Sequence, residues 1–445
     1  MAMQAQLLRD GSATSATSPD NVRKAVIAAT IGTIIEWYDY ALYGAAAGLI
    51  INKLFFPQLS PAAGVLAAFA TFAVGFFIRP LGGIVISHFG DRYGRKPALI
   101  FTIALMGVAT VAMGLLPTFK DIGVGAPVLL VLLRLLQGFG AGAEYAGAVT
   151  LVSEYAPPAR RGFLTAFLQS ATVVGIMIAT IAFLAVSYVP EEVLLGWAWR
   201  IPFLLSALLF LVALYIRNRL EETPEYLAAM ERAEERKRNE RVPLGELLRN
   251  SPREVLFGFL AVTGHNANAY ILNAFALSYM TNTLGMPRTD SLIAVIVSSF
   301  VGVLATPVMG WIGDRIGCAR VYMFGAGFMI IFAFPLFAML ASRNIVLATL
   351  AMSLAYGLGF GGMAGPQGAF LANLFPTRYR FSGIAFAREL NGLLIAGPTP
   401  FIASALVGMS GGSPRPVAIY LILCCLLTIV AVAYIRGRAV NTGHD

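Results

Sequence analysis

Seven charged residues stand inside long apolar stretches of the sequence, where a charge is costly and therefore informative. They are Glu36, Asp39, Arg79, Arg134, Glu144, Arg388 and Glu389. If these stretches lie in a bilayer, each charge costs about 2.5–3.5 kcal/mol on insertion scales. Such residues must face a bundle interior, pair with one another or meet water, so we expect most of them to line a buried site.

The stretch around Glu36 carries a polar and aromatic stripe. On an α-helix, Glu36, Asp39, Tyr40 and Tyr43 fall within an arc of about 100°. Two acids close together in a low-dielectric cavity hinder each other's ionisation and can exchange a proton near neutral pH. We therefore expect Glu36 and Asp39 to take up and release a proton. The alternative is a structural ion pair with a neighbouring arginine.

A second stripe contains Arg134, Gln137 and Glu144, which fall within about 80° on a helix. A guanidinium fork matches a carboxylate, so Arg134 and Gln137 are predicted to bind an anionic group, or Arg134 balances the acids. The alternative is a buried pair of Arg134 with Glu144, although ten helical residues separate them by about 15 Å. Glu144 is a third candidate for proton exchange.

The second half of the chain offers further candidates. His265 is predicted either to bind substrate or relay a proton, or only to pack between helices. Arg388 and Glu389 point about 100° apart, so one is expected to bind substrate while the other pairs elsewhere; a gate pair is the alternative. The remaining expected lining residues are Trp37, Tyr145, Asn268 and Asn391. Arg79 is expected to be structural, snorkelling or bracing the loop at Asp91.

The elements that position these residues are predicted from composition. Apolar residues make up 58% of the 445 residues and charged residues 12%. The apolar residues form blocks of roughly 20, enough for a helix to cross a bilayer, and backbone groups in lipid must be satisfied internally. We predict an all-α membrane protein with twelve spans. These are 25–51, 62–87, 98–117, 125–150, 162–188, 198–218, 253–283, 290–313, 320–341, 345–371, 382–408 and 415–436.

The basic residues indicate orientation. Most of the 32 Lys and Arg fall in alternate loops on one side of the predicted spans, which is the positive-inside pattern. Both termini are therefore expected in the cytoplasm, with the chain in a bacterial inner membrane. Because topology explains the net charge of +9, nucleic acid is not an expected partner. The expected partners are lipid, a small-molecule substrate and a proton. We expect the protein to be a monomer. Cys318, Cys424 and Cys425 predict neither a disulfide nor a metal site.

The chain divides into two related halves. A charged linker, 219–252, is expected to lie as a solvated helix on the cytoplasmic face. It separates six-helix bundles at 25–218 and 253–436, with tails at 1–24, expected to be disordered, and 437–445. The loop Gly90–Lys96 has a similar counterpart at Gly313–Arg320, which indicates an internal repeat. The loop acids are expected to accept from a helix N-terminus or an arginine and so to form a gate; the alternative is a plain positive-inside anchor. Expected gate residues are Asp91, Arg92, Arg95, Glu154, Arg161, Asp314 and Arg315.

These residues resemble a known family. The loop Gly90-Asp91-Arg92-Tyr93-Gly94-Arg95-Lys96 resembles the signature loop of major facilitator superfamily transporters. The metabolite:proton symporter branch is similar to the chain at Glu36–Tyr40, Arg79–Gly83, Arg134–Gly138 and Trp199–Phe203. That branch includes transporters of shikimate, 2-oxoglutarate, citrate and proline or betaine, and Phe55–Gly83 looks most like the shikimate transporter. Ser87, Ala143 and Cys318-Ala319 depart from the family pattern, which weakens the substrate assignment.

The resemblance implies proton-coupled uptake of a small organic acid, such as shikimate or a di- or tricarboxylate, by alternating access. It implies no enzymatic activity and no cofactor. A proline or betaine-type zwitterion symporter is the main alternative. A drug:proton antiporter is disfavoured because the fifth predicted span has no Gly-Pro motif, a sensor because the termini are short, and ATP-driven transport because no nucleotide-binding loop occurs.

Overall fold

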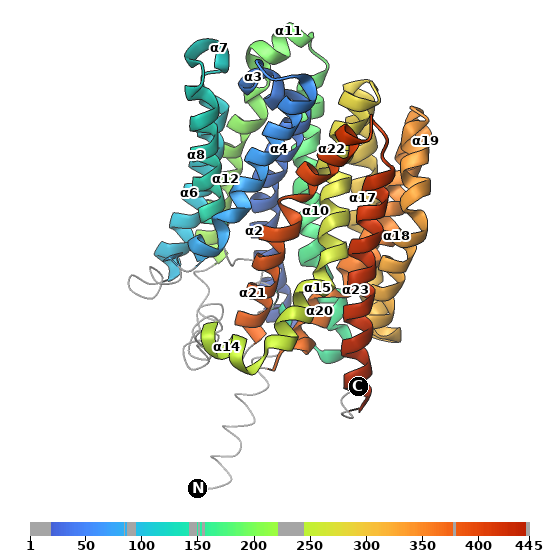
Figure 1. The fold of residues 1–445 in the computed structure, drawn as a ribbon. Helices are drawn as coiled ribbons and strands as arrows, with labels where there is room; N and C mark the ends of the chain where they lie inside the picture. Colours follow the sequence, from blue (N-terminus) through green and yellow to red (C-terminus); the bar gives the residue numbers. More distant parts are fainter. Residues whose placement is uncertain are drawn as a thin grey trace.

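A computed structural model describes residues 19–83, 85–86, 95–141, 149, 152–153, 156–220, 244–376 and 380–441. Within these ranges the regular elements are helices, and helices lie over all twelve predicted spans (Figure 1). The six in the N-terminal half are α2 (Pro19–Ala46, continued by a π-helical turn Ala47–Ile51 and α3, Asn52–Phe55), α4 (Pro61–Phe77), α6 (Arg95–Leu115), α8 (Gly125–Gly140), α10 (Arg161–Ser187) and α12 (Arg200–Leu220).

The C-terminal half contains the other six, and three of them are interrupted. They are α15 (Pro252–Tyr270, continued to Thr283 through α16, Ala276–Ser278), α17 (Arg288–Ile316), α18 (Cys318–Ala341), α19 (Ile345–Leu354) with α20 (Gly361–Leu374), α21 (Arg380–Asn391) with α22 (Thr399–Met409), and α23 (Arg415–Asn441). The short connecting helices are α7 (Phe119–Ile122), α11 (Glu191–Val193) and α14 (Leu244–Asn250).

Length and hydropathy agree with a membrane protein. In the described ranges, eight helices are long and apolar enough to cross a bilayer, and a ninth candidate is the pair Glu191–Ala198 and Arg200–Val212, bent by 42°. Two more apolar helices, Phe101–Leu115 and Gly125–Gly140, are shorter. The start of α2 and the end of α23 lie at the same end of the bundle, as an even number of crossings requires (Figure 1).

Several boundaries differ from the prediction by a few residues. The first helix begins at Pro19 rather than at residue 25, so the last residues of the expected tail are helical. The sixth helix runs to Leu220, and α14 occupies the end of the expected linker. The solvated helix predicted from the charges at 231–241 lies outside the described residues.

Two C-terminal spans are interrupted at stretches that contain glycine or proline. Between α19 and α20 the helix widens into a π-helical segment, Ala355–Phe360. Between α21 and α22 a π-helical turn, Gly392–Ala396, is followed by a turn at Gly397-Pro398. Proline removes a backbone donor and glycine lacks a Cβ, so both sequences loosen the helical ladder.

Helices α10 and α17 form the main seam between the halves. Helix α10 packs along α2 in its own half and along α17 and α20 in the other. Its apolar partners approach closely because small residues face the seam: a Cβ on Gly310 would lie 2.7 Å from the Gly162 carbonyl oxygen. Small residues are the usual means by which membrane helices approach each other.

Candidate functional site

Arg79, two residues beyond the end of α4, forms a buried ion pair with Glu36 of α2. Arg79 Nη2 lies 3.0 Å from Glu36 Oε1, and the two side chains are only 11% and 7% exposed. The Arg79 guanidinium also lies over the Tyr40 ring at 4.5 Å and near the Phe76 ring at 5.1 Å. Because an inward carboxylate satisfies Arg79 without reaching water, the predicted snorkelling is wrong. The alternative, a contact with the loop at Asp91, falls on residues outside the described ranges and stays a prediction.

Arg134 is held completely inside the N-terminal half. Its Nη2 donates to the Phe72 carbonyl oxygen at 2.8 Å, and its Nη1 donates to Gln137 Oε1. Its guanidinium lies 4.3 Å from the Tyr43 ring centre. Gly75 on α4 makes room for this group, since a Cβ there would lie 2.9 Å from Arg134 Nη2. Arg134 has no exposed surface, and its Nε has no hydrogen-bond partner in the described part of the chain.

Asp39 turns away from Glu36, contrary to the expected acid pair. Ser206 of α12 donates to Asp39 Oδ1 at 2.5 Å, and Asp39 is 3% exposed. Gln137 Nε2 donates to the Asp39 carbonyl oxygen at 3.3 Å and to Thr110 Oγ1 at 2.8 Å. The two acids therefore bond to separate partners on different segments, Glu36 to Arg79 and Asp39 to Ser206.

Aromatic rings fill the space where the halves meet in mid-membrane. Tyr270 of α15 contacts Trp37 of α2 at 6.3 Å between ring centroids, Phe72 at 5.9 Å and Phe76 at 5.6 Å. Tyr40 contacts Phe76 at 5.7 Å. We call these five residues the aromatic box. Tyr40 and Phe76 of the box also contact the Arg79 guanidinium, and Tyr40 and Phe72 contact that of Arg134, so both arginines lie against the box.

A polar chain crosses from α10 into the C-terminal half. Gln169 Nε2 donates to Gln367 Oε1 at 2.9 Å and lies 3.3 Å from His265 Nε2. Arg388 donates to the same Gln367 oxygen at 2.7 Å. When the Gln169 amide donates to His265 Nε2, the ring proton sits on Nδ1, which is buried without a partner among the described residues. His265 packs on Phe360 at 4.9 Å.

Two more C-terminal candidates, Asn391 and Asn268, differ in the hydrogen bonds that their side-chain amides make. Asn391 is fully bonded: it accepts from Asn266 at 2.6 Å and donates to Thr263 Oγ1 at 2.9 Å. Asn268 is completely buried, yet neither its Oδ1 nor its Nδ2 has a partner in the described ranges. An unpaired buried amide costs free energy, so Asn268 is poised to bond to something that enters.

Glu389 lies on the Arg79 side of the interface, while its neighbour Arg388 faces Gln367. Glu389 lies near Arg79 and Tyr40, across the boundary between the halves. Its Oε2 is buried without a hydrogen-bond partner among the described residues. Arg79 is thus influenced by one acid from each half, Glu36 and Glu389.

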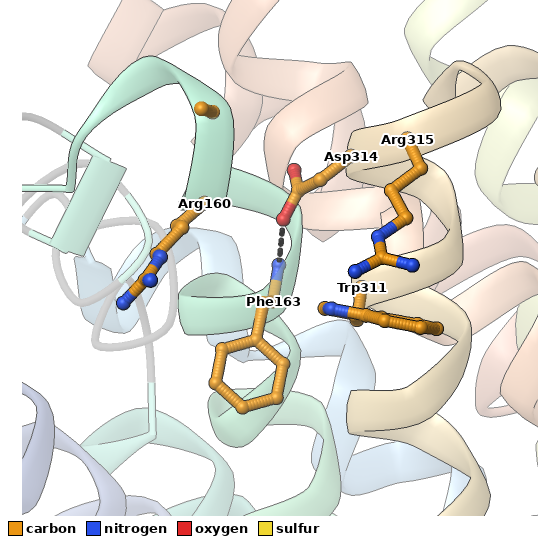
Figure 2. Close-up of a pocket in the computed structure, with 6 residues that line it drawn as sticks. Arg160, Phe163, Trp311, Asp314 and Arg315 are labelled. Carbon is orange, nitrogen blue, oxygen red and sulfur yellow. Dashed lines mark hydrogen bonds between the residues drawn. The ribbon is translucent and has the colours of Figure 1, made fainter.

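The expected gate acid Asp314 bonds across the halves at the end of the seam where α10 begins. Its two carboxylate oxygens accept from Gly162 N at 2.7 Å and from Phe163 N at 2.8 Å, in the first turn of α10 (Figure 2). Of the two partners expected for this acid, the helix N-terminus is the one observed. Arg161 donates to Asn373 Oδ1 of α20 at 3.3 Å.

Other predicted residues cannot be placed. Asp91, Arg92, Glu144, Tyr145 and Glu154 lie outside the described residues, and so does the side chain of Arg95, although Arg95 begins α6. The N-terminal copy of the gate and the third acid of the proton hypothesis therefore stay predictions.

The sequence reasoning missed four polar residues that the structure brings to this region. Gln169 and Gln367 join the halves, while Thr110 and Ser206 engage Gln137 and Asp39. The free-energy cost of burial, which singles out charged residues in apolar stretches, is smaller for amides. Gln169 and Gln367 nevertheless stand in apolar stretches and were open to the same argument; a serine or threonine in a helix is usually satisfied by its own backbone and gives no signal.

Comparisons with known proteins agree with this architecture. A family model described as "Sugar (and other) transporter" matches residues 24–242, and one described as "Major Facilitator Superfamily" matches residues 258–444. The shikimate transporter of Escherichia coli (strain K12) is 37% identical over 420 residues, 94% of this chain and 95% of the relative. The proline/betaine transporter of Escherichia coli (strain K12) is 34% identical over 425 residues, covering 94% and 84%.

A solved structure supports the fold. A D-xylose-proton symporter superposes with a TM-score of 0.70 at 20% sequence identity, covering 93% of this chain and 97% of that one. At this identity the likeness supports the arrangement of helices and says nothing of the ligand.

Proposed function

Because this chain belongs to the major facilitator superfamily, we propose that it imports a small organic acid together with a proton by alternating access. Its relatives are transporters of small metabolites and not enzymes, and the chain is a membrane transporter of that kind. Proton coupling and the class of substrate are the proposal.

The observation that carries the proposal is the buried charge behind the aromatic box. Arg79 pairs with Glu36 at 3.0 Å, and Arg134 lies behind the same Tyr40 ring, 5.5 Å from its centre. Protonation of an acid beside these arginines leaves a positive charge that is uncompensated in a low-dielectric site. A carboxylate substrate offsets that charge, so proton and anion favour each other's binding.

Glu36 and Asp39 are the proposed proton carriers, with Glu144 as a third. Protonation of Glu36 would release Arg79, which lies at the boundary with the C-terminal half. Protonation of Asp39 would instead affect Arg134, through Gln137, which bonds to both residues. The alternative, that Glu36 and Arg79 form a purely structural pair, predicts that substrate and proton do not affect each other.

The substrate groups can be matched to side chains. We propose that Arg134 and Arg388 bind carboxylates, and that Asn268, His265 and the Tyr40 hydroxyl bond to polar groups of the same ligand. The similarity to the shikimate transporter favours a hydroxylated acid over a simple one.

The aromatic box supports one competing substrate class. Rings beside an acid, here Glu389, form the kind of site that binds a quaternary ammonium group. Relatives that transport proline and betaine share about one third of their residues with this chain. A betaine-like zwitterion is therefore the second candidate, with its carboxylate on an arginine and its cation in the box.

The test is uptake by purified protein in proteoliposomes. A labelled panel would contain shikimate, di- and tricarboxylates, proline and betaine, each offered with and without an inward proton gradient. We expect an organic acid to accumulate only with the gradient, and Arg134→Ala to abolish its uptake while the surface variant Arg320→Ala does not. Uptake indifferent to the gradient would refute symport; preference for betaine would select the zwitterion.

A further inference from the structure

A pocket opens at the inner end of the α10–α17 seam, away from the central site. It has a volume of about 370 Å³ and is lined by Ala159, Arg160, Phe163, Trp311, Asp314 and Arg315. Three of these residues belong to the N-terminal half and three to the C-terminal half. We propose that it binds the phosphate headgroup of an anionic phospholipid, which thereby bridges the two halves.

The charges of the pocket fit an anion. Arg160 and Arg315 are exposed and come from opposite halves, one on each side of the pocket (Figure 2). The nearby acid, Asp314, is already used, since both of its oxygens accept backbone N–H groups of α10. The two arginines outnumber this one acid, so the pocket lining carries a net positive charge that favours an anion.

Arg315 is held in place by an aromatic ring. Its guanidinium lies over the Trp311 ring at 3.6 Å, one turn earlier on α17 (Figure 2). A guanidinium that stacks on a ring keeps its N–H groups free to donate within the guanidinium plane, which suits a phosphate. Tryptophan is also the side chain most typical of the membrane–water boundary, which places this pocket at headgroup depth.

An apolar stripe on α17 provides the path for an acyl chain. Five exposed residues at spacings of three and four run along one face of the helix to the pocket: Val297, Phe300, Leu304, Val308 and Trp311. Their exposed fractions range from 42% to 57%. Because this stripe is continuous with the pocket, a ligand that has both a phosphate and a hydrocarbon chain matches it better than free phosphate.

Lipid binding is measured directly by native mass spectrometry of the protein released from nanodiscs of equal phosphatidylglycerol and phosphatidylcholine. We expect the wild type to retain phosphatidylglycerol preferentially. An arginine in direct contact with the lipid headgroup contributes about fivefold to such binding, so Arg160→Gln and Arg315→Gln should each lower the preference about fivefold. Arg320→Gln, on the exposed side of α18 at the same end, should leave it unchanged.

Three results would overturn the proposal. The first is an unchanged preference in both pocket variants. The second is an equal loss in Arg320→Gln, which would mean general surface charge. The third is full displacement of phosphatidylglycerol by inorganic phosphate, which would mean that the headgroup alone binds. Arg160→Lys and Arg315→Lys keep the charge and should retain the preference, which guards against a folding artefact.

Discussion

At the scale of single residues, the two buried arginines share one tyrosine ring. The guanidinium carbon of Arg79 lies 4.5 Å from the centre of the Tyr40 ring and that of Arg134 lies 5.5 Å from it. Two cations near one ring repel each other, so each depends on its own acceptors: Glu36 for Arg79, and Phe72 and Gln137 for Arg134. Loss of an acceptor of one arginine therefore also affects the other arginine.

The Glu36–Arg79 pair should be strongly coupled in stability. Breaking a buried pair leaves an uncompensated charge and costs about 3–5 kcal/mol. We expect Arg79→Met to lower the free energy of unfolding by that amount, and Glu36→Gln with Arg79→Met to recover much of it. A double-mutant cycle by unfolding in mixed micelles measures this coupling.

The exposed pair Lys53–Glu191 is the matched control. Its atoms lie 2.5 Å apart, but its side chains are 45% and 57% exposed. An exposed pair contributes up to about 1 kcal/mol, so its cycle should give a much smaller coupling. Equal coupling in the two cycles would mean that the Glu36–Arg79 pair is not the buried charge centre described here.

Arg134→Lys should impair transport although it keeps the charge. A lysine cannot bond to Phe72 and Gln137 in the geometry of a planar fork while presenting a further donor to a carboxylate. Loss of one charge-assisted bond corresponds to about tenfold or more in KM for the organic acid. Initial uptake rates measure it. Arg200→Lys is the control, since Arg200 bonds to the Gly114 and Leu116 carbonyl oxygens, away from the site. An unaltered KM in Arg134→Lys would exclude Arg134 from substrate binding.

Sequence reasoning identified the charged residues of the site but not their partners. The cost of a buried charge singles out Arg134 and Glu36 without any structure. The partner of Arg79 depends on how α2 and α4 are rotated against each other, which a one-dimensional pattern does not contain. The same limit explains why Glu36 and Asp39, close on a helical wheel, face different neighbours.

At the scale of elements, the seam of α10 and α17 determines how the halves fit at the inner end. Gly162 and Gly310 let the backbones approach, and Asp314 then reaches the first N–H groups of α10. An acid at a helix N-terminus is favoured by the unsatisfied N–H groups and by the helix dipole. Close packing and this charge interaction therefore depend on each other.

Gly310→Ala should open the inner end. Its Cβ would lie 2.7 Å from the Gly162 carbonyl oxygen and 2.8 Å from the Ala166 Cβ, so the helices must separate. Overpacking of this kind costs about 1–3 kcal/mol, which shifts the equilibrium towards an inner-open state by about tenfold. Spin labels at Arg160 and Arg320 report the distance between the halves.

Gly327→Ala provides the control for that experiment, because nothing lies within 4 Å of a Cβ at Gly327. We expect its label distances to match those of the wild type. Distances unchanged in Gly310→Ala would contradict a tight inner seam.

The spans were predictable because an apolar block long enough to cross a bilayer must be helical. Glycine and proline mark the interruption at Gly397-Pro398 in the sequence. The π-helical turn Ala47–Ile51 contains one glycine and no proline, and it depends on packing: a Cβ on Gly48 would lie 3.1 Å from the Ser278 Cβ in the opposite half.

At the scale of the whole molecule, the halves touch at both ends and in the middle of the bundle. Asp314 bonds to α10 at the end of the seam where α10 begins, Gln169 bonds to Gln367 in the middle at 2.9 Å, and Asn282 donates to the Gly48 carbonyl oxygen at 2.6 Å at the opposite end. Alternating access requires the contacts at the two ends to break in turn while the central residues hold their ligand. Because Arg79 is subject to acids of both halves, the state of its charges can favour one arrangement over another.

The most direct test of this account records internal pH as substrate enters. Proteoliposomes that contain a trapped pH dye, with no initial pH gradient and with potassium and valinomycin to clamp the voltage, receive the organic acid that the panel selects. Symport predicts that the lumen acidifies as the acid accumulates, and that Glu36→Gln or Asp39→Asn removes the acidification. Substrate entry with an unchanged internal pH, or with alkalinisation, would contradict proton symport.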